Sequence, residues 1–244
     1  MKKHIPNALT LLNLLCGSIA VIFVINNNFL TASFFVFLGI FFDFFDGFIA
    51  RKLKVQSELG LQLDSLADMV TSGLVPGMIM YKLLNLTESS WNHITVNSIL
   101  SFKEILFFPL FGLAITLASA YRLAKFNIDE DQQTYFKGLP TPANTLLMVS
   151  LPLILEFQNN DYINAIILNK WFLITITILS CYLLNSSIKL FALKFKDYSF
   201  SNNVTRYIFI MLCLVLLIVL KFAAIPIIIL LYIIMSVLDN LTSK

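Results

Sequence analysis

The chain has 244 residues, of which 58% are hydrophobic and 13% charged, and its formal net charge at pH 7 is +3. Soluble domains carry about 45–50% apolar and about 25% charged residues, so this composition excludes an ordinary water-soluble domain and predicts a membrane protein. The small net charge gives no indication of nucleic-acid binding. The three cysteines lie in apolar runs without metal-ligand spacing, which argues against a disulfide framework and against a zinc site.

Apolar runs long enough to cross a bilayer, about 17–25 residues each, recur along the chain. The segments expected to span the membrane are 8–26, 29–50, 61–84, 102–124, 143–158, 171–191, 205–222 and 224–238. The fifth contains Pro152 and follows a stiff turn at 138–142, and the last two are separated only by 221–226. The predicted fold is all-α, a polytopic transmembrane helical bundle of about eight spans forming one integral membrane domain over residues 1–244.

Basic residues are distributed unevenly over the connections between these spans. If the N-terminus is cytoplasmic, most lysines and arginines fall on the cytoplasmic side, and the far side holds only Lys82, Lys103, Lys170 and Lys221. Because cytoplasmic loops carry an excess of basic residues, this asymmetry predicts an N-terminus that faces the cytoplasm. An even number of spans returns the C-terminus to the same side.

Four aspartates interrupt the second and third predicted spans. Asp43 and Asp46 are three residues apart, and Asp64 and Asp68 are four apart. On helices each pair shares one face, and a short cytoplasmic link at 51–57 would bring both pairs to the same depth. Ionisable groups at membrane depth are costly and mark functional sites. Carboxylates suit hard cations, so we expect a site for divalent ions, Mg²⁺ or Mn²⁺, with two ions offsetting four charges.

A different functional class also places acids inside membranes, namely cation or proton transporters. Their sites are expected nearer the bilayer midplane, often on broken helices. The acids of this chain cluster toward one membrane face beside the basic link that begins at Arg51. This position favours an enzyme over a transporter.

The acids belong to a longer pattern, D-x-x-D-G-x-x-A-R-x8-G-x3-D-x3-D, which the chain fills completely. Its residues are Asp43, Asp46, Gly47, Ala50, Arg51, Gly60, Asp64 and Asp68. The pattern resembles the signature of the CDP-alcohol phosphatidyltransferases. The resemblance implies a metal-dependent membrane enzyme in which an alcohol attacks the lipid-side phosphorus of a CDP-linked lipid and CMP leaves.

The same resemblance implies a role for each signature residue. Metal ions would be bound by Asp43, Asp46, Asp64 and Asp68, and Asp68 would also act as the general base on the alcohol. CDP would be bound by Asp43, Gly47, Ala50, Arg51, Gly60 and Asp64. The resemblance further implies a homodimer in the bacterial inner membrane, with the active site facing the cytoplasm.

Flanking segments narrow the resemblance to the branch that uses serine. Residues 6–17, 57–68, 122–127 and 138–143 resemble the corresponding parts of bacterial phosphatidylserine synthases. The resemblance covers roughly residues 5–145, the expected catalytic core, and leaves 171–238 as additional transmembrane helices. It implies CDP-diacylglycerol and L-serine as substrates, with glycerol 3-phosphate or inositol phosphate as alternative acceptors.

Two further groups of polar residues allow two interpretations each. Arg122 and Lys125, at the inner end of the fourth predicted span, would bind the serine carboxylate or lipid phosphates, or would anchor the helix with snorkelling stems. Asn7, Thr10 and Asn13 recur at helical spacing and would face the nucleotide or hydrogen-bond between helices.

Overall fold

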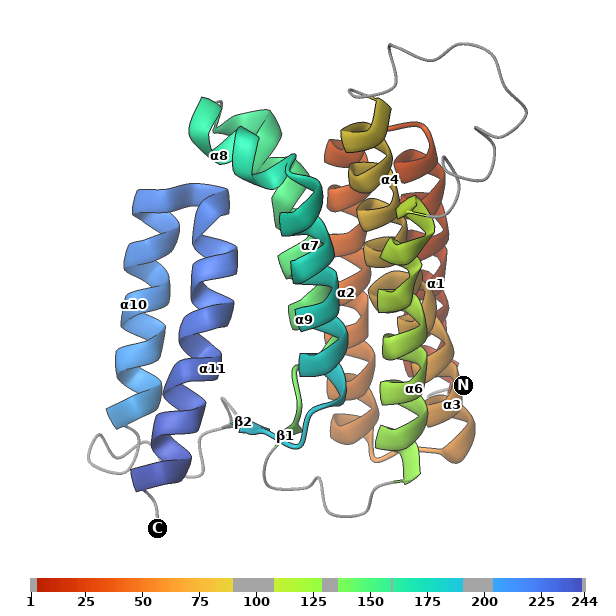
Figure 1. Cartoon of the computed structure of the whole chain (residues 1–244). Helices are drawn as coiled ribbons and strands as arrows, with labels where there is room; N and C mark the ends of the chain where they lie inside the picture. Colours follow the sequence, from red (N-terminus) through yellow and green to blue (C-terminus); the bar gives the residue numbers. More distant parts are fainter. Residues whose placement is uncertain (1–3, 90–107, 129–135, 159, 191–203, 243–244) are drawn as a thin grey trace.

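The computed structural model describes residues 4–89, 108–128, 136–158, 160–190 and 204–242, and this part of the chain is almost entirely helical (Figure 1). Its α-helices are α1 (His4–Ile25), α2 (Phe29–Leu53), α3 (Glu58–Asp68), α4 (Val75–Ser89), α6 (Ala114–Ile128), α7 (Thr141–Phe157), α8 (Asp161–Ile167), α9 (Lys170–Asn185), α10 (Val204–Leu220) and α11 (Ala224–Thr242). A π-helix, η1 (Met69–Leu74), joins α3 to α4, and 3₁₀ turns occur at η3 (Phe111–Leu113) and η4 (Lys221–Ala223). The predicted all-α class is confirmed.

The first two helices form an antiparallel hairpin. Residues next to the helix ends determine where α2 begins and ends and where α3 begins. Asn28 caps α2 by accepting a hydrogen bond from the Thr31 backbone N–H at 3.1 Å. At the other end Lys54 takes the left-handed conformation that terminates α2. Ser57 then caps α3 by accepting from the Gly60 N–H at 3.1 Å. Since only residues 54–57 separate the two helices, the end of α2 lies next to the start of α3.

The third long run is continuous from α3 through η1 to α4, with a wide turn in the middle. Its sequence carries Pro76, which has no backbone N–H and whose ring would clash with the Ser72 carbonyl in a regular α-helix. Instead, the Val75 N–H reaches back five residues to the Val70 carbonyl. The predicted span 61–84 lies inside this run, but the π turn within it was not predicted.

The turn before α7 lies at the predicted residues 138–142. Pro140 and Pro142 flank the first residue of the helix, where a missing N–H costs nothing. Gly138 has a φ of +74°, and a Cβ there would lie 2.7 Å from the Leu184 carbonyl oxygen, so both conformation and space require glycine. The two-residue strands β1 (Phe136–Lys137) and β2 (Lys189–Leu190) pair antiparallel beside it. The expected span 171–191 is therefore too long, because α9 ends at Asn185 and β2 follows.

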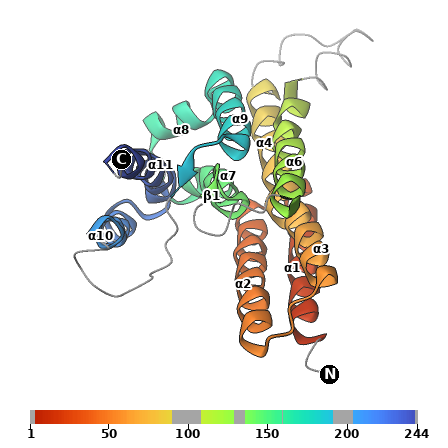
Figure 2. The same ribbon diagram turned by 90° about the horizontal axis from the view of Figure 1, so that it is seen from below.

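The last two helices, α10 and α11, form a second hairpin that reverses at η4 (Figure 1). The Gln158 side chain fastens the turn, since its Nε2 donates to the Leu220 carbonyl and its Oε1 accepts from the Ala223 N–H, both at 2.9 Å. At the other end the Asn240 side chain donates to the Lys189 carbonyl at 2.6 Å. Figure 2, seen from below, shows α10 and α11 on the opposite side of the molecule from α1 and α3.

Three described stretches are long and apolar enough to cross a membrane: His4–Ile25, Phe29–Leu53 and Arg206–Asn240. The last includes the reversal at η4, and a fourth span results if α8 and α9, bent by 60°, are taken together. Large apolar side chains cover the outer surface, Leu117 at 73% and Ile218 at 80% exposure among them. These features and the family found below identify an integral membrane protein; the expectation of eight spans stays a prediction.

Candidate active site

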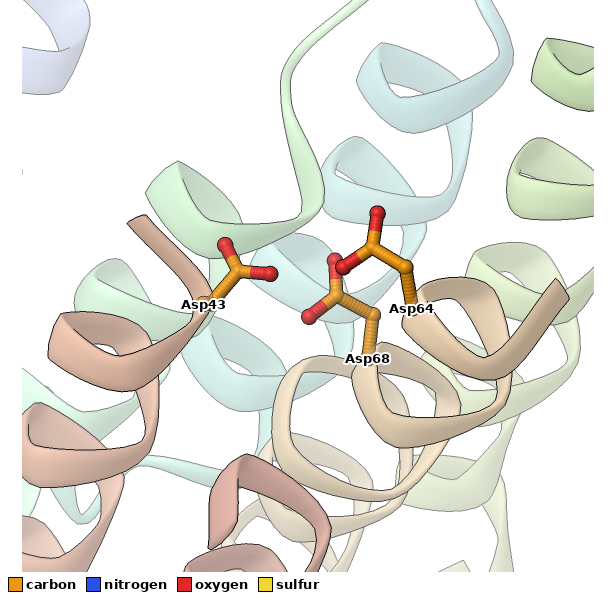
Figure 3. A group of neighbouring side chains, drawn as sticks. All are labelled: Asp43, Asp64 and Asp68. Carbon is orange, nitrogen blue, oxygen red and sulfur yellow. The ribbon is translucent and has the colours of Figure 1, made fainter. Parts of the chain in front are cut away.

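Three aspartates from two helices meet inside the bundle: Asp43 lies ten residues before the end of α2, and Asp68 is the last residue of α3. Asp43 of α2 and Asp64 and Asp68 of α3 each offer a carboxylate oxygen, and these three atoms lie within 4.8 Å of one another. Figure 3 shows the three carboxylates pointing toward a common centre. The four-residue spacing thus places Asp64 and Asp68 on one face of α3, as predicted, but Asp46, three residues from Asp43, does not join them. We call Asp43, Asp64 and Asp68 the acid cluster.

The acid cluster has the chemistry of a cation site. All three side chains are half-buried, and like charges this close repel strongly unless a cation or protons neutralise them. Oδ1 of Asp64 is fully enclosed and has no hydrogen-bond partner within the described part of the chain. A buried carboxylate oxygen without a donor is costly, and a metal ion would satisfy it. Oxygen ligands alone fit Mg²⁺ or Mn²⁺ better than zinc or copper.

The fourth aspartate, Asp46, lies outside the acid cluster. Its carboxylate is 95% buried and accepts a hydrogen bond from the Thr10 hydroxyl of α1. Asn13, one turn further along α1, donates from Nδ2 to Oδ1 of Asp68 at 3.3 Å. Of the two interpretations of the polar positions on α1, hydrogen bonding between helices therefore holds for Thr10 and Asn13. One face of α1 orients an acid on α2 and an acid on α3.

A cavity of about 460 Å³ opens beside the acid cluster, between α1, α2 and α3. Its lining residues are Pro6, Asn7, Thr10, Asp46, Gly47, Ala50, Arg51, Val55, Gln56, Ser57, Glu58, Gly60, Leu61 and Asp64. The volume lies in the range of small-molecule sites. Five of the six residues expected to bind CDP line this cavity, and the sixth, Asp43, lies in the acid cluster instead.

Within this cavity Gly47 allows Arg51 to fold back along α2. A Cβ at Gly47 would lie 3.4 Å from one terminal guanidinium nitrogen of Arg51, at van der Waals contact, so the guanidinium lies beside this glycine. The planar guanidinium is suited to phosphate oxygens. The glycine and the arginine of the signature thus act together at one wall of the cavity.

Arg122 and Lys125 line a second, separate cavity of about 20 Å³, which has room for about one water-sized group. The other lining residues are Phe126, Lys137, Leu184, Asn185 and Ser186. Arg122 is only 8% exposed. No hydrogen bond or ion pair among the described residues involves its guanidinium, although Tyr232 of α11 interacts with it electrostatically. A buried positive charge without an ion-pair partner is costly, so this guanidinium favours an anionic ligand.

A hydrogen-bonded pair that the sequence analysis missed ties the two sites together. The Asn127 amide of α6 donates to the Ser65 hydroxyl of α3 at 2.9 Å, and that hydroxyl lies 3.2 Å from the Asn127 Oδ1. Ser65 directly follows Asp64, so α6 is held against the acid-bearing helix. Polar residues far apart in sequence carry no periodic signal for such a contact, and the same applies to Lys137, Asn185 and Ser186 in the wall of the small cavity.

Comparison with known proteins identifies the class of this site. The CDP-alcohol phosphatidyltransferase family model matches residues 3–183. The chain belongs to this family. The match covers α1 to α9 and ends before the hairpin of α10 and α11.

Several curated relatives carry the same name. The chain is 36% identical over 164 residues to the CDP-diacylglycerol–serine O-phosphatidyltransferase of Bacillus subtilis, covering 67% of this chain and 81% of that protein. For the enzyme of the same name from Methanocaldococcus jannaschii, the identity is 31% over 163 residues, covering 67% of this chain and 66% of that protein. For the one from Saccharomyces cerevisiae it is 35% over 129 residues, covering 49% and 40%.

Proposed function

We propose that this protein transfers the phosphatidyl group of CDP-diacylglycerol to the hydroxyl of L-serine, giving phosphatidylserine and CMP. The observation that carries the proposal is the convergence of the family signature: its eight residues surround one cavity and the adjoining acid cluster. The relatives named for this reaction support the choice of serine. An enzyme of the same family with glycerol 3-phosphate or inositol phosphate as acceptor is the alternative.

The larger cavity would hold the CDP moiety. Gly47, Ala50 and Gly60 form walls without bulky side chains, and Arg51 would contact phosphate oxygens. Asp43 and Asp64 would complete the CDP site at its inner end. In this arrangement the diphosphate lies next to the acid cluster, and the acyl chains of the lipid extend into the bilayer.

The four aspartates would hold divalent cations, Mg²⁺ or Mn²⁺ and two per site, which when bound neutralise diphosphate charge. Asp68 would accept the proton of the serine hydroxyl as the new oxygen–phosphorus bond forms and the bond to CMP breaks. Asn13 orients Asp68 from α1, and Thr10 orients Asp46. Oδ1 of Asp64 is buried and has no hydrogen-bond partner within the described residues, which supports the assignment of Asp64 as a metal ligand.

Arg122 and Lys125, which line the small basic cavity, would bind the carboxylate of serine. Arg122 has a buried guanidinium and no hydrogen-bond partner within the described ranges, and Lys125 adds a second positive charge at the rim. A guanidinium binds a carboxylate through two parallel hydrogen bonds. A lipid phosphate is the other anion that these two residues would bind.

The surroundings of the site follow the same proposal. The N-terminus and the active site would face the cytoplasm in a bacterial inner membrane, where a soluble amino acid and a lipid-linked nucleotide meet. The catalytic core would be residues 5–145 of one integral membrane domain, with 171–238 as additional helices, and two copies would form a homodimer. Lys170 and Lys221 support the orientation, since the elements that carry them, α9 and η4, begin at the end opposite to the acid cluster (Figure 1).

A headgroup panel tests the proposal. Purified protein with CDP-diacylglycerol, Mn²⁺ and one alcohol at a time, namely serine, glycerol 3-phosphate, inositol phosphate or inositol, is assayed for CMP release and for the lipid product. Phosphatidylserine should form with serine and be abolished by a chelator. Product with another alcohol and none with serine would overturn the serine assignment. Ion flux in sealed liposomes without any CMP release would instead identify a transporter.

A further inference from the structure

The π turn η1 begins at the residue after Asp68, so it is the first structural feature beyond the acid cluster. Thr71, Ser72 and Gly73 in this turn are buried. In a regular α-helix the Ser72 carbonyl would accept from the N–H of residue 76, but that residue is Pro76 and has none. Instead, the Val75 N–H donates to the Val70 carbonyl, which makes this turn one residue wider than an α-helical turn. Pro76 is the sequence cause of the wide turn.

Two side chains of other helices, and one side chain of the turn itself, hold this turn in place. The Thr145 hydroxyl of α7 lies 3.0 Å from the Ser72 carbonyl oxygen, the acceptor that Pro76 leaves without its helical donor. The Thr116 hydroxyl of α6 donates to the Gly73 carbonyl at 3.1 Å. Thr71 itself donates to the Asn13 carbonyl of α1 at 3.1 Å. π-Helical turns are rare and hydrogen-bond poorly within themselves, so such external bonds stabilise the wide turn.

The wide turn changes which way α3 faces relative to α4. An α-helix advances about 100° per residue, so one extra residue in a turn rotates everything on one side of it by about that angle. On one side of η1, Asp64 and Asp68 point at Asp43 of α2. On the other side, α4 buries Ile79, Leu83 and Leu84 in the bundle core. Without the extra residue, a straight helix would turn one of these faces away from its partner.

We propose that Pro76 and the π turn it imposes set the rotation of Asp64 and Asp68 toward Asp43, and that Thr145 is the positioning residue that locks the turn. Thr145 touches no substrate. It acts through the Ser72 carbonyl, four residues or about one helical turn beyond Asp68, the nearest acid. Its hydroxyl proton is shared, because the Thr141 carbonyl oxygen also lies within 2.9 Å. The proposal rests on the proposed function for the cation site that Mn²⁺ would fill and for its activity readout.

Two variants and two controls test the proposal. Pro76→Ala restores the missing N–H and permits a regular α-helix, and Thr145→Val removes the hydroxyl without changing the side-chain shape. Thr145→Ser keeps the hydroxyl. Thr177→Val is the matched control, since Thr177 is equally buried but bonds only the Leu173 carbonyl of its own helix, at 2.8 Å. Each protein is titrated with Mn²⁺ in detergent, and thermal stabilisation and CMP release from CDP-diacylglycerol and serine are recorded.

For Pro76→Ala and Thr145→Val we expect the Mn²⁺ concentration for half-maximal stabilisation to rise about tenfold, as for other changes to groups that orient metal ligands. Without metal the unfolding temperature of Thr145→Val should fall by no more than a few degrees, as expected for the loss of a buried hydroxyl. Thr145→Ser and Thr177→Val should titrate like wild type. Wild-type Mn²⁺ dependence in Thr145→Val would overturn the proposal, even if Pro76→Ala failed to fold. Stabilisation by Mn²⁺ needs no substrate. It therefore tests whether Pro76 and Thr145 position the acids even if serine gives no product.

Discussion

The end of the bundle that holds the acids and the C-terminal hairpin of α10 and α11 are built in opposite ways. Around the acids, buried polar side chains hydrogen-bond from one helix to another, as Thr10 does to Asp46 and Asn13 to Asp68. The hairpin is almost wholly apolar, with α10 largely exposed and α11 packed against the core, and described polar bonds fasten it there through Gln158 and Asn240. Apolar packing discriminates poorly between helix neighbours in a bilayer, because lipid tails are equally apolar. Hydrogen bonds between helices therefore fix the positions of the helices around the acids. The hairpin is attached to the core by only a few described hydrogen bonds near its ends.

The largest effect is expected at the acid cluster. Asp64→Asn keeps the shape of the side chain but removes a charge from the group formed with Asp43 and Asp68. Loss of a carboxylate ligand should lower turnover on the order of a thousandfold, about 4 kcal/mol of transition-state stabilisation. The measurement is CMP release at increasing Mg²⁺ or Mn²⁺, with thermal unfolding in detergent to verify folding.

Asp161→Asn serves as the control for this substitution, since Asp161 begins α8 and is exposed. It should leave turnover within about twofold of wild type, as surface substitutions usually do. Full turnover of Asp64→Asn at saturating metal would refute the assignment of Asp64 as a ligand. The buried polar contacts around the acids would then not be explained by catalysis.

A smaller and more selective effect is expected in the basic cavity. Arg122→Gln should raise the KM for serine about tenfold or more and change the KM for CDP-diacylglycerol by less than about twofold, because one charged hydrogen bond to the carboxylate is lost. Without substrate the variant should be at least as stable as wild type, since a buried guanidinium without a hydrogen-bond partner is costly. Steady-state kinetics with each substrate varied, and thermal unfolding, measure both.

Lys82→Gln, which removes a positive charge near the C-terminal end of α1, is the control. It should leave both KM values unchanged. If Arg122→Gln raised the KM for CDP-diacylglycerol instead, Arg122 would be binding a lipid phosphate and the carboxylate assignment would fall.

Much of this site could be predicted from sequence because its information is local. The spacing from Asp43 to Asp46 and from Asp64 to Asp68 places each pair on one helix face, and the short link keeps the two helices adjacent. Spacing does not encode how far each helix is rotated about its axis. For that reason the separation of Asp46 from the acid cluster was not predicted, nor was the placement of Arg122 in a cavity of its own.

The π turn was missed for a different reason. Pro76 within an apolar run is compatible with a kink, a break or a wide turn, and the choice depends on partners such as Thr145, 69 positions away in sequence from Pro76. The end of the span expected at 171–191 was misplaced because β2 pairs with β1, a contact between segments about 50 residues apart. Both errors are tertiary effects on an otherwise correct helical pattern.

The smallest effect on turnover is expected at the hydrogen bonds that attach the hairpin to the core. Gln158→Leu leaves the Leu220 carbonyl and the Ala223 N–H without the partners they have in the turn η4. Each lost hydrogen bond should cost about 1 kcal/mol, so the unfolding temperature in detergent should fall by a few degrees. CMP release at 25 °C should stay within about twofold, because no contact of Gln158 reaches the acids. Asn26→Leu is the matched control, since the Asn26 amide bonds only the Ile22 carbonyl of its own helix and is exposed; it should change neither quantity. A loss of turnover in Gln158→Leu as large as that of Asp64→Asn would mean that the hairpin, although outside the matched part of the family, takes part in shaping the site. Lowered stability with intact turnover would mean that polar contacts at the far end of α7 hold this pair of helices in place without carrying chemistry.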